Sequence, residues 1–212
     1  MAEKPTVMAV QKALESAKKR NFTETVELAI NLKDVDLSMP KNRITDDIIL
    51  PYGRGKSIRI CVIGGGELVQ KAKDVADVVI TADELQAIAD DKKQAKKLAN
   101  SVDYFIAEAP MMGVVGKRLG TVLGPRGKMP KPIPPGQDPT GMIEALRKTV
   151  SVRTKDRITF HAPVGTVSMS PEELAENIDT ILKRVELKLE KGRMNIASSY
   201  VKTTMGPSER LI

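Results

Sequence analysis

Apolar and polar residues follow three different periods along this chain. Residues 6–20 repeat apolar side chains at helical spacing and predict an amphipathic helix, whose last turn carries the cationic run 18–20. Residues 26–32 alternate apolar with polar side chains, which is typical of a half-buried strand. Residues 57–63 are almost continuously apolar, as in a strand buried on both faces. The chain therefore combines half-buried with fully buried strands.

The middle of the chain alternates strands with helices. Apolar runs at 78–80 and 104–107 are separated by stretches of helical character at 83–100 and 112–120, and a further helix is predicted at 140–150. Strand–helix alternation is typical of a parallel, doubly wound sheet. We therefore predict a small α/β domain here.

The two outer parts of the chain have a different pattern of predicted elements. We expect a second strand at 45–50, a β-hairpin from 151–153 and 157–160 that ends at 163–165, and a last strand that Gly206-Pro207 stops. Ser170-Pro171-Glu172-Glu173 predicts a helix start, with Ser as the cap and Glu three residues later.

Neither outer part is long enough to bury a core alone. Joined, residues 1–52 and 151–212 predict a two-layer α+β domain with antiparallel strands under two helices. Residues 53–150 are then an inserted α/β domain, held by two tethers that would permit hinge motion. The predicted fold class is α/β plus α+β in two domains.

Charge and composition restrict the classes of function that fit this chain. The chain of 212 residues is 41% hydrophobic and 29% charged, which suits a soluble protein with a real core. Its formal net charge of +7 favours a polyanionic partner. Cys61 is the only cysteine, so no internal disulfide is expected, which fits a reducing cytosol. We see no signal peptide and no apolar stretch of membrane-spanning length, and expect a cytoplasmic protein.

One long window of the inserted domain carries charge of a single sign. Residues 109–137 contain no Asp or Glu. Pro and Gly crowd residues 123–132, which predicts an exposed loop that presents cations to phosphate. The alternative is an ordinary solvated surface loop with no ligand. The length of the window without a carboxylate makes this alternative less favoured. The candidate contact residues are Lys117, Arg118, Arg126, Lys128 and Lys131.

Hydroxyl side chains crowd residues 198–207, where one Lys occurs and no carboxylate. Hydroxyls and backbone amides donate to phosphate and ribose oxygens, and Gly206 lets a partner backbone come close. The same residues also suit the polar face of an ordinary strand, and this stretch alone does not decide between the two interpretations.

The enzyme alternative depends on Gly64-Gly65-Gly66, which follows a predicted strand. A dinucleotide fingerprint requires another Gly at the position of Val69, and the sequence has no Walker-type loop. His161 is the only histidine and pairs with no evident nucleophile. We predict no catalytic residues, no metal and no cofactor, and keep a nucleotide-binding α/β enzyme as the alternative.

Six motifs, taken in order, resemble the ribosomal protein L-one family and cover nearly the whole chain. The short amino terminus, Tyr52 and Lys128 resemble its archaeal branch. The matching motifs are Phe22-Thr23-Glu24-Thr25-Val26-Glu27, Leu50-Pro51-Tyr52-Gly53-Arg54-Gly55-Lys56, Met112-Gly113, Leu123-Gly124-Pro125-Arg126-Gly127-Lys128-Met129-Pro130, His161-Ala162-Pro163-Val164-Gly165 and Thr203-Thr204-Met205-Gly206-Pro207-Ser208.

The resemblance implies a fold and a set of partners. Members have a terminal-half domain with a split β-α-β arrangement and an inserted Rossmann-like, three-layer α/β domain. They bind large-subunit ribosomal RNA (rRNA) at the mobile stalk beside the tRNA exit site, where deacylated tRNA leaves. Some repress translation by binding their own messenger RNA. By resemblance we expect a ribosome-associated protein that is monomeric when free.

The family's main RNA contact lies in the terminal domain. Asn21 and Thr166 depart from residues that are often basic in bacterial members, so no contact is carried over to them. The RNA-binding candidates of this domain are Phe22, Thr25, Glu27, Lys41, Asn42, Ser198, Thr203, Thr204, Met205 and Gly206.

Overall fold

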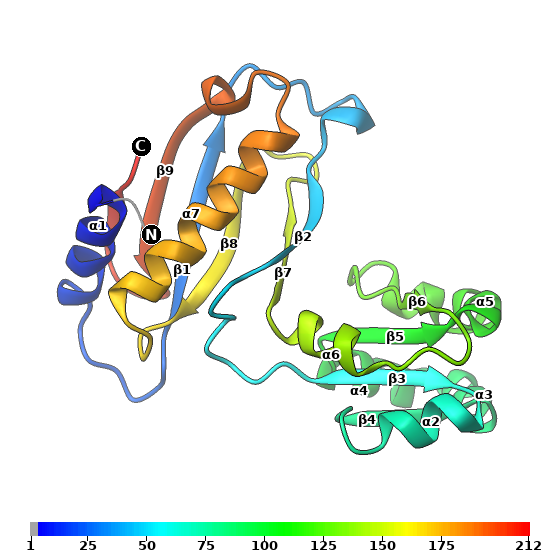
Figure 1. The fold of residues 1–212 in the computed structure, drawn as a ribbon. Coiled ribbons are helices and arrows are strands. Elements are labelled where there is room, and N and C mark those ends of the chain that lie inside the picture. The colour runs from blue at the N-terminus through cyan, green and yellow to red at the C-terminus, as the bar shows by residue number, and fades with distance from the viewer. Residues whose placement is uncertain (1–3) are drawn as a thin grey trace. The chain divides into compact units, whose positions relative to one another are not determined.

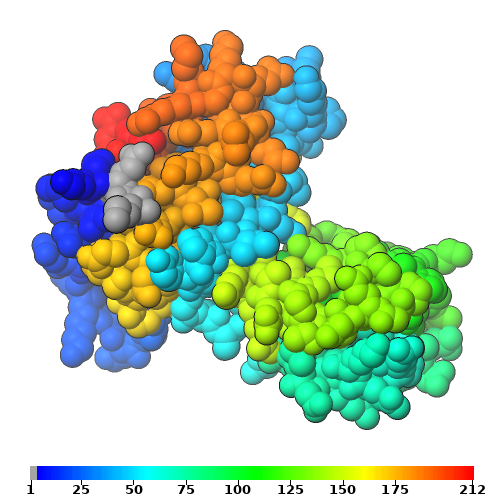
Figure 2. Space-filling model, viewed as in Figure 1, coloured from blue at the N-terminus to red at the C-terminus, as the bar shows by residue number. Residues whose placement is uncertain are grey.

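The computed structural model describes residues 4–212, and the chain divides into two compact units (Figure 1). The first unit joins the chain up to Lys56 to Lys148–Ile212, and the second unit is Ser57–Arg147. In Figure 2 the blue residues near the amino terminus and the orange and red residues of the carboxyl-terminal part pack together in the first unit. The second unit is therefore an insertion.

A four-stranded antiparallel sheet forms one layer of the first unit, in the order β10-β9-β1-β8. In its centre, Leu28 lies opposite Ala162 on one side and Val201 on the other, and all three are fully buried. The strands are β1 (Thr25–Leu32), β8 (Thr159–Thr166), β9 (Ile196–Thr203) and β10 (Ser208–Arg210).

Two helices, α1 (Lys4–Glu15) and α7 (Pro171–Lys188), pack against this sheet as the second layer (Figure 1). The capping box at the start of α7 forms as predicted: Ser170 Oγ accepts from the Glu173 amide, and the Glu173 carboxylate accepts from the Ser170 amide. Apolar residues of both helices share one core with the central strands. The predicted two-layer α+β architecture is confirmed.

A separate antiparallel ribbon pairs β2 (Thr45–Ile49) with β7 (Thr149–Arg153). The predicted hairpin between residues 151–153 and 157–160 is therefore wrong, because β7 pairs with β2 and β8 pairs with β1. Ile44 and Thr154 exchange two hydrogen bonds that prolong the ribbon, and the chain then turns at Lys155 with a φ of 47°. β8 also continues through 163–165 to Thr166.

Two predicted helices are corrected as well. Helix α1 ends at Glu15, where the Ser16 hydroxyl bonds the carbonyl of Lys12, so the cationic run 18–20 lies outside the helix. The stretch 83–100 forms two helices, because Asp91 leaves the helical conformation and caps the second one through the Lys93 amide. These are α3 (Ala82–Asp90) and α4 (Lys92–Ser101).

The second unit is a parallel sheet with helices on both faces, in the strand order β4-β3-β5-β6. Alternate residues of the middle strands enter two different cores: Ile63 packs with α3, α4 and α5, and Val62 packs with α2 and α6. The predicted three-layer α/β architecture is confirmed. The elements are β3 (Ile60–Gly64), α2 (Gly66–Ala72), β4 (Val78–Thr81), β5 (Tyr104–Glu108), α5 (Met112–Leu123), β6 (Lys131–Ile133) and α6 (Thr140–Arg147).

Some short elements carry no periodic signal in the sequence. β6 lies partly inside the segment 123–132 that was expected to be a loop, and β10 follows Pro207. Short 3-10 helices form at η1 (Pro40–Asn42), η2 (Ala109–Met111) and η3 (Gly192–Asn195). Among the described residues, no helix has the length and apolar character that crossing a membrane requires.

The two segments that lead to the insertion leave the first unit side by side, since the Leu50 amide donates to the Lys148 carbonyl at 2.9 Å. Fully buried Asn177 of α7 fastens one of them: its amide nitrogen donates to the carbonyls of Gly53 and Val164, at 2.9 and 3.0 Å. The first unit therefore holds both segments with its own hydrogen bonds.

Candidate nucleic-acid interface

The two ends of the first unit meet at the turn after β9, beside the first residue of β1. The Thr204 amide donates to the Thr25 carbonyl at 3.0 Å, and the Thr25 amide donates to Thr204 Oγ1 at 3.2 Å. The Thr204 hydroxyl also lies 3.1 Å from the Thr25 carbonyl. These bonds join residues 179 positions apart in the sequence, and Thr204 remains exposed. Two distant candidates thus form one fixed surface.

Large apolar side chains stand exposed at this same end of the sheet. Phe22 is 56% exposed and Met205 is 60% exposed, although the chain has few aromatic residues. Gly206 packs closely behind them, because a Cβ there would collide with Thr203 Oγ1. We call Phe22, Thr25, Glu27, Thr204, Met205 and Gly206 the terminal platform.

Charged side chains lie within and beside the terminal platform. Half-buried Glu27 lies directly opposite Lys202 in the pairing of β1 with β9. Lys18, Lys19 and Arg20 are exposed in the segment between α1 and β1. A carboxylate among cations and hydroxyls can accept hydrogen bonds from a polar ligand while the cations attract its phosphates.

Four predicted residues are not part of the terminal platform. Thr203 is fully buried, so its side chain supports the turn and does not reach the surface. Ser198 lies opposite Asn31 and accepts from it at 2.8 Å, about 20 Å along β9 from Thr204 at the usual rise per residue. Lys41 and Asn42 lie in η1, and the Lys41 ammonium is 3.5 Å from the carboxylate of Glu190, which follows α7.

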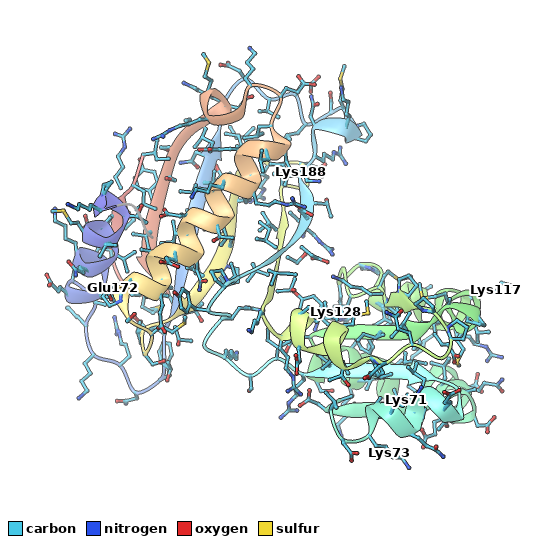
Figure 3. The ribbon with its side chains drawn as sticks, in the orientation of Figure 1. Lys71, Lys73, Lys117, Lys128, Glu172 and Lys188 are labelled. Atoms are coloured by element: carbon cyan, nitrogen blue, oxygen red, sulfur yellow. The ribbon has the colours of Figure 1, made fainter. Side chains whose placement is uncertain are left out.

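The five predicted cations of the inserted unit are only partly free for a ligand. The Lys128 ammonium donates to the carbonyls of Ala99 and Val102, at 2.9 and 2.6 Å, and so closes the carboxyl-terminal end of α4. Arg126 donates to Asn100 and Val122, Arg118 pairs with Asp90 at 2.9 Å, and Lys131 lies over the Tyr104 ring. Lys117 is exposed on α5, and Figure 3 shows it and Lys128 in this unit.

Helix α4 adds a cationic face that was not predicted from the sequence. Its four lysines are all exposed, while Ala95 and Ala99 face the core. The sequence signal was the pair of Lys-Lys steps four residues apart, which places all four on the outer side of one helix. The residues are Lys92, Lys93, Lys96 and Lys97.

The glycine turn after β3 does not offer a phosphate site. The Gly65 amide already donates to the Glu108 carboxylate at 2.8 Å, so a negative charge occupies the position where a nucleotide phosphate would bind. Burial raises the pKa of the Cys61 thiol to about 12, which removes the thiolate needed for nucleophilic chemistry. Across residues 4–212, no cluster of metal-binding side chains occurs.

The described residues form a two-domain protein: an antiparallel two-layer unit with a doubly wound unit inserted in it, and both units expose lysine and arginine side chains. The chain belongs to the ribosomal protein L1p/L10e family, whose model matches residues 13–207. This confirms the family resemblance that the sequence motifs predict.

Curated relatives match along most or all of the chain. A protein named large ribosomal subunit protein uL1 from Methanocella arvoryzae is 56% identical over 213 residues and covers both chains completely. Its namesake from Thermoplasma acidophilum is 54% identical over 93% of this chain and 91% of its own. The Archaeoglobus fulgidus protein of the same name is 51% identical, over 97% and 96% of the two chains.

Proposed function

We propose that this chain is a structural constituent of the large ribosomal subunit in the cytoplasm, where it binds large-subunit rRNA at the mobile stalk near the tRNA exit site. Full-length similarity to proteins named large ribosomal subunit protein uL1 supports the ribosomal role. The observation that carries RNA binding is the bonded junction of Thr25 with Thr204 at an exposed surface. That role requires no catalysis.

The terminal platform suits folded RNA because its donors and acceptors are fixed before binding. Hydroxyl and amide groups meet riboses and phosphates, and the exposed Phe22 ring can stack on a base or ribose. Glu27 gives no attraction to phosphate, so its part is to accept from a ribose 2′-hydroxyl or a base amine. Such a contact adds discrimination between RNAs rather than general affinity.

The inserted unit supplies long-range attraction and a second RNA contact. Exposed Lys117 and the four lysines of α4 can approach phosphates directly. Of the other predicted contact residues, Lys128 is held by carbonyls of its own unit, and we assign it to the support of that surface. Deacylated tRNA at the exit site is a further polyanion that such a surface can meet.

Repression of the chain's own messenger RNA follows if that messenger folds like the stalk RNA, because one rigid platform then accepts both. Free protein would bind the messenger once stalk RNA is saturated. We expect the free chain to be a monomer. The family resemblance supports both statements.

A salt-dependent binding measurement tests the function. The full chain is titrated with a stalk-region rRNA and with a scrambled RNA of equal length. We expect the stalk RNA to bind at least 100-fold more tightly, since each specific contact contributes roughly 1–3 kcal/mol. Equal affinities for the two RNAs would contradict the proposal.

Glu27→Ala isolates discrimination from attraction. We expect it to weaken stalk RNA about tenfold and to leave scrambled RNA within about twofold of the unaltered chain. Glu172→Ala is the matched control, because Glu172 is an exposed carboxylate at the start of α7 (Figure 3). Equal losses of affinity for both RNAs would show that Glu27 does not discriminate between them.

A further inference from the structure

A cavity of about 260 Å³ opens beside the terminal platform, between the end of α1 and the start of β1. Its volume lies just below the range of drug-sized ligand pockets, so it suits a group smaller than such a ligand. Its lining includes both apolar and cationic side chains. The lining residues that matter are Leu14, Lys18, Lys19, Arg20, Phe22 and Glu24.

Glu24 is the unusual member of this lining. Its side chain is only 5% exposed, and its Oε1 accepts no hydrogen bond. The nearest cationic atom in the described structure, Arg20 Nε, lies 3.9 Å from that oxygen, which is too far for a hydrogen bond. A buried carboxylate oxygen without a donor is costly, and such groups require a reason.

The groups around the cavity match the parts of one nucleotide. Phe22 offers an exposed ring on which a base can stack. Glu24 Oε1 offers an acceptor for a base amine, as carboxylates do for the N4 amine of cytosine. Lys18, Lys19 and Arg20 are the cations that a phosphate requires.

We propose that this cavity receives one unpaired, amine-bearing base of the bound RNA, cytosine or adenine, stacked on Phe22 with its amine donating to Glu24. The cavity thus makes Glu24 a specificity-determining residue, separate from Glu27 on the strand surface. The inference rests on the proposed RNA-binding function, because the base arrives as part of that RNA.

Cytidine and uridine 5′-monophosphates form a matched pair of probes, since they share ribose and phosphate and differ where cytosine carries its amine. Each is titrated into the isotopically labelled full chain while backbone amide resonances are followed. We expect shifts confined to residues 14–24 and Val167, with cytidine monophosphate binding about tenfold more tightly. Equal affinities, or shifts elsewhere, would overturn the proposal.

Glu24→Gln should reduce the preference for cytidine over uridine monophosphate to less than twofold, because a neutral amide can donate to uracil as well as accept from cytosine. Glu172→Gln makes the same chemical change outside the cavity and should keep the tenfold preference. An unchanged preference in folded Glu24→Gln would contradict the assignment.

Phe22→Leu keeps the assignment testable if Glu24→Gln does not fold. It should weaken both nucleotides about equally and preserve their ratio, because stacking does not read the amine. If Phe22→Leu bound both nucleotides with full affinity, that result would show that no base stacks on Phe22 in this cavity. Stalk RNA binding is measured separately, so a chain that binds stalk RNA but does not distinguish the two nucleotides refutes this inference alone.

Discussion

Asn177 offers the sharpest test of how the first unit is held together. Its side chain is fully buried and makes three hydrogen bonds: it donates to the carbonyls of Gly53 and Val164 and accepts from the Tyr52 amide at 3.3 Å. It thereby connects α7, β8 and the segment that leads to the insertion. Asn177→Leu keeps a similar volume and removes all three bonds.

The expected loss can be worked from these contacts. The carbonyls of Gly53 and Val164 would each lose a buried donor, while the Tyr52 amide is partly exposed and can turn to water. With about 1 kcal/mol for each buried bond and a smaller term for the third, the free energy of unfolding should fall by about 2 to 3 kcal/mol. The added apolar contact of Leu does not offset this loss of stability, because the two buried carbonyls are left without a hydrogen-bond donor.

Urea denaturation followed by circular dichroism measures this loss. The two units can unfold in separate transitions, and labelling of the buried Cys61 thiol identifies the transition of the inserted unit. The destabilisation should fall on the other transition. Asn21→Leu, at an exposed asparagine, is the control and should change stability by less than about 0.5 kcal/mol. A similarly small effect of Asn177→Leu would refute the reasoning.

Three further predictions concern the two units and the turn. Replacing Ser57–Arg147 by a short glycine linker should leave a folded, RNA-binding first unit; loss of cooperative unfolding would contradict this. Cys61, buried with a pKa raised to about 12, should resist a thiol reagent at pH 8 until denaturant is added, and immediate labelling would contradict its burial. Gly206→Ala should lower the free energy of unfolding in urea by about 1–3 kcal/mol, because the new Cβ clashes with Thr203. Gly116→Ala is the control, since a Cβ there meets open space on α5 and should not destabilise the chain. Equal effects of the two substitutions would exclude the clash.

Much of the fold could be predicted from sequence because the signals were local. The period of two in β1, the unbroken apolar run of β3 and the capping box of α7 each fix an element without reference to the rest of the chain. The hairpin prediction failed because strand pairing depends on distant partners. Residues 149–153 suit an antiparallel neighbour equally well whether it precedes or follows them, and β2 provides it.

The candidate site was harder to predict for the same reason. Phe22 and Thr204 carry motif signals, but only the sheet order places β9 beside β1 and so brings them to one end. Ser198 belongs to the same polar stretch yet lies near the other end of β9. Local sequence also gives no sign that Glu24 is buried or that carbonyls engage Lys128.

Hydrogen exchange of the full chain, with and without stalk-region rRNA, tests the central claim most directly. If the two chain ends form one RNA-binding platform, peptides covering residues 20–27 and 203–207 should gain protection together, at the same RNA concentration. Protection confined to residues 57–147, with both terminal segments unchanged, would contradict it.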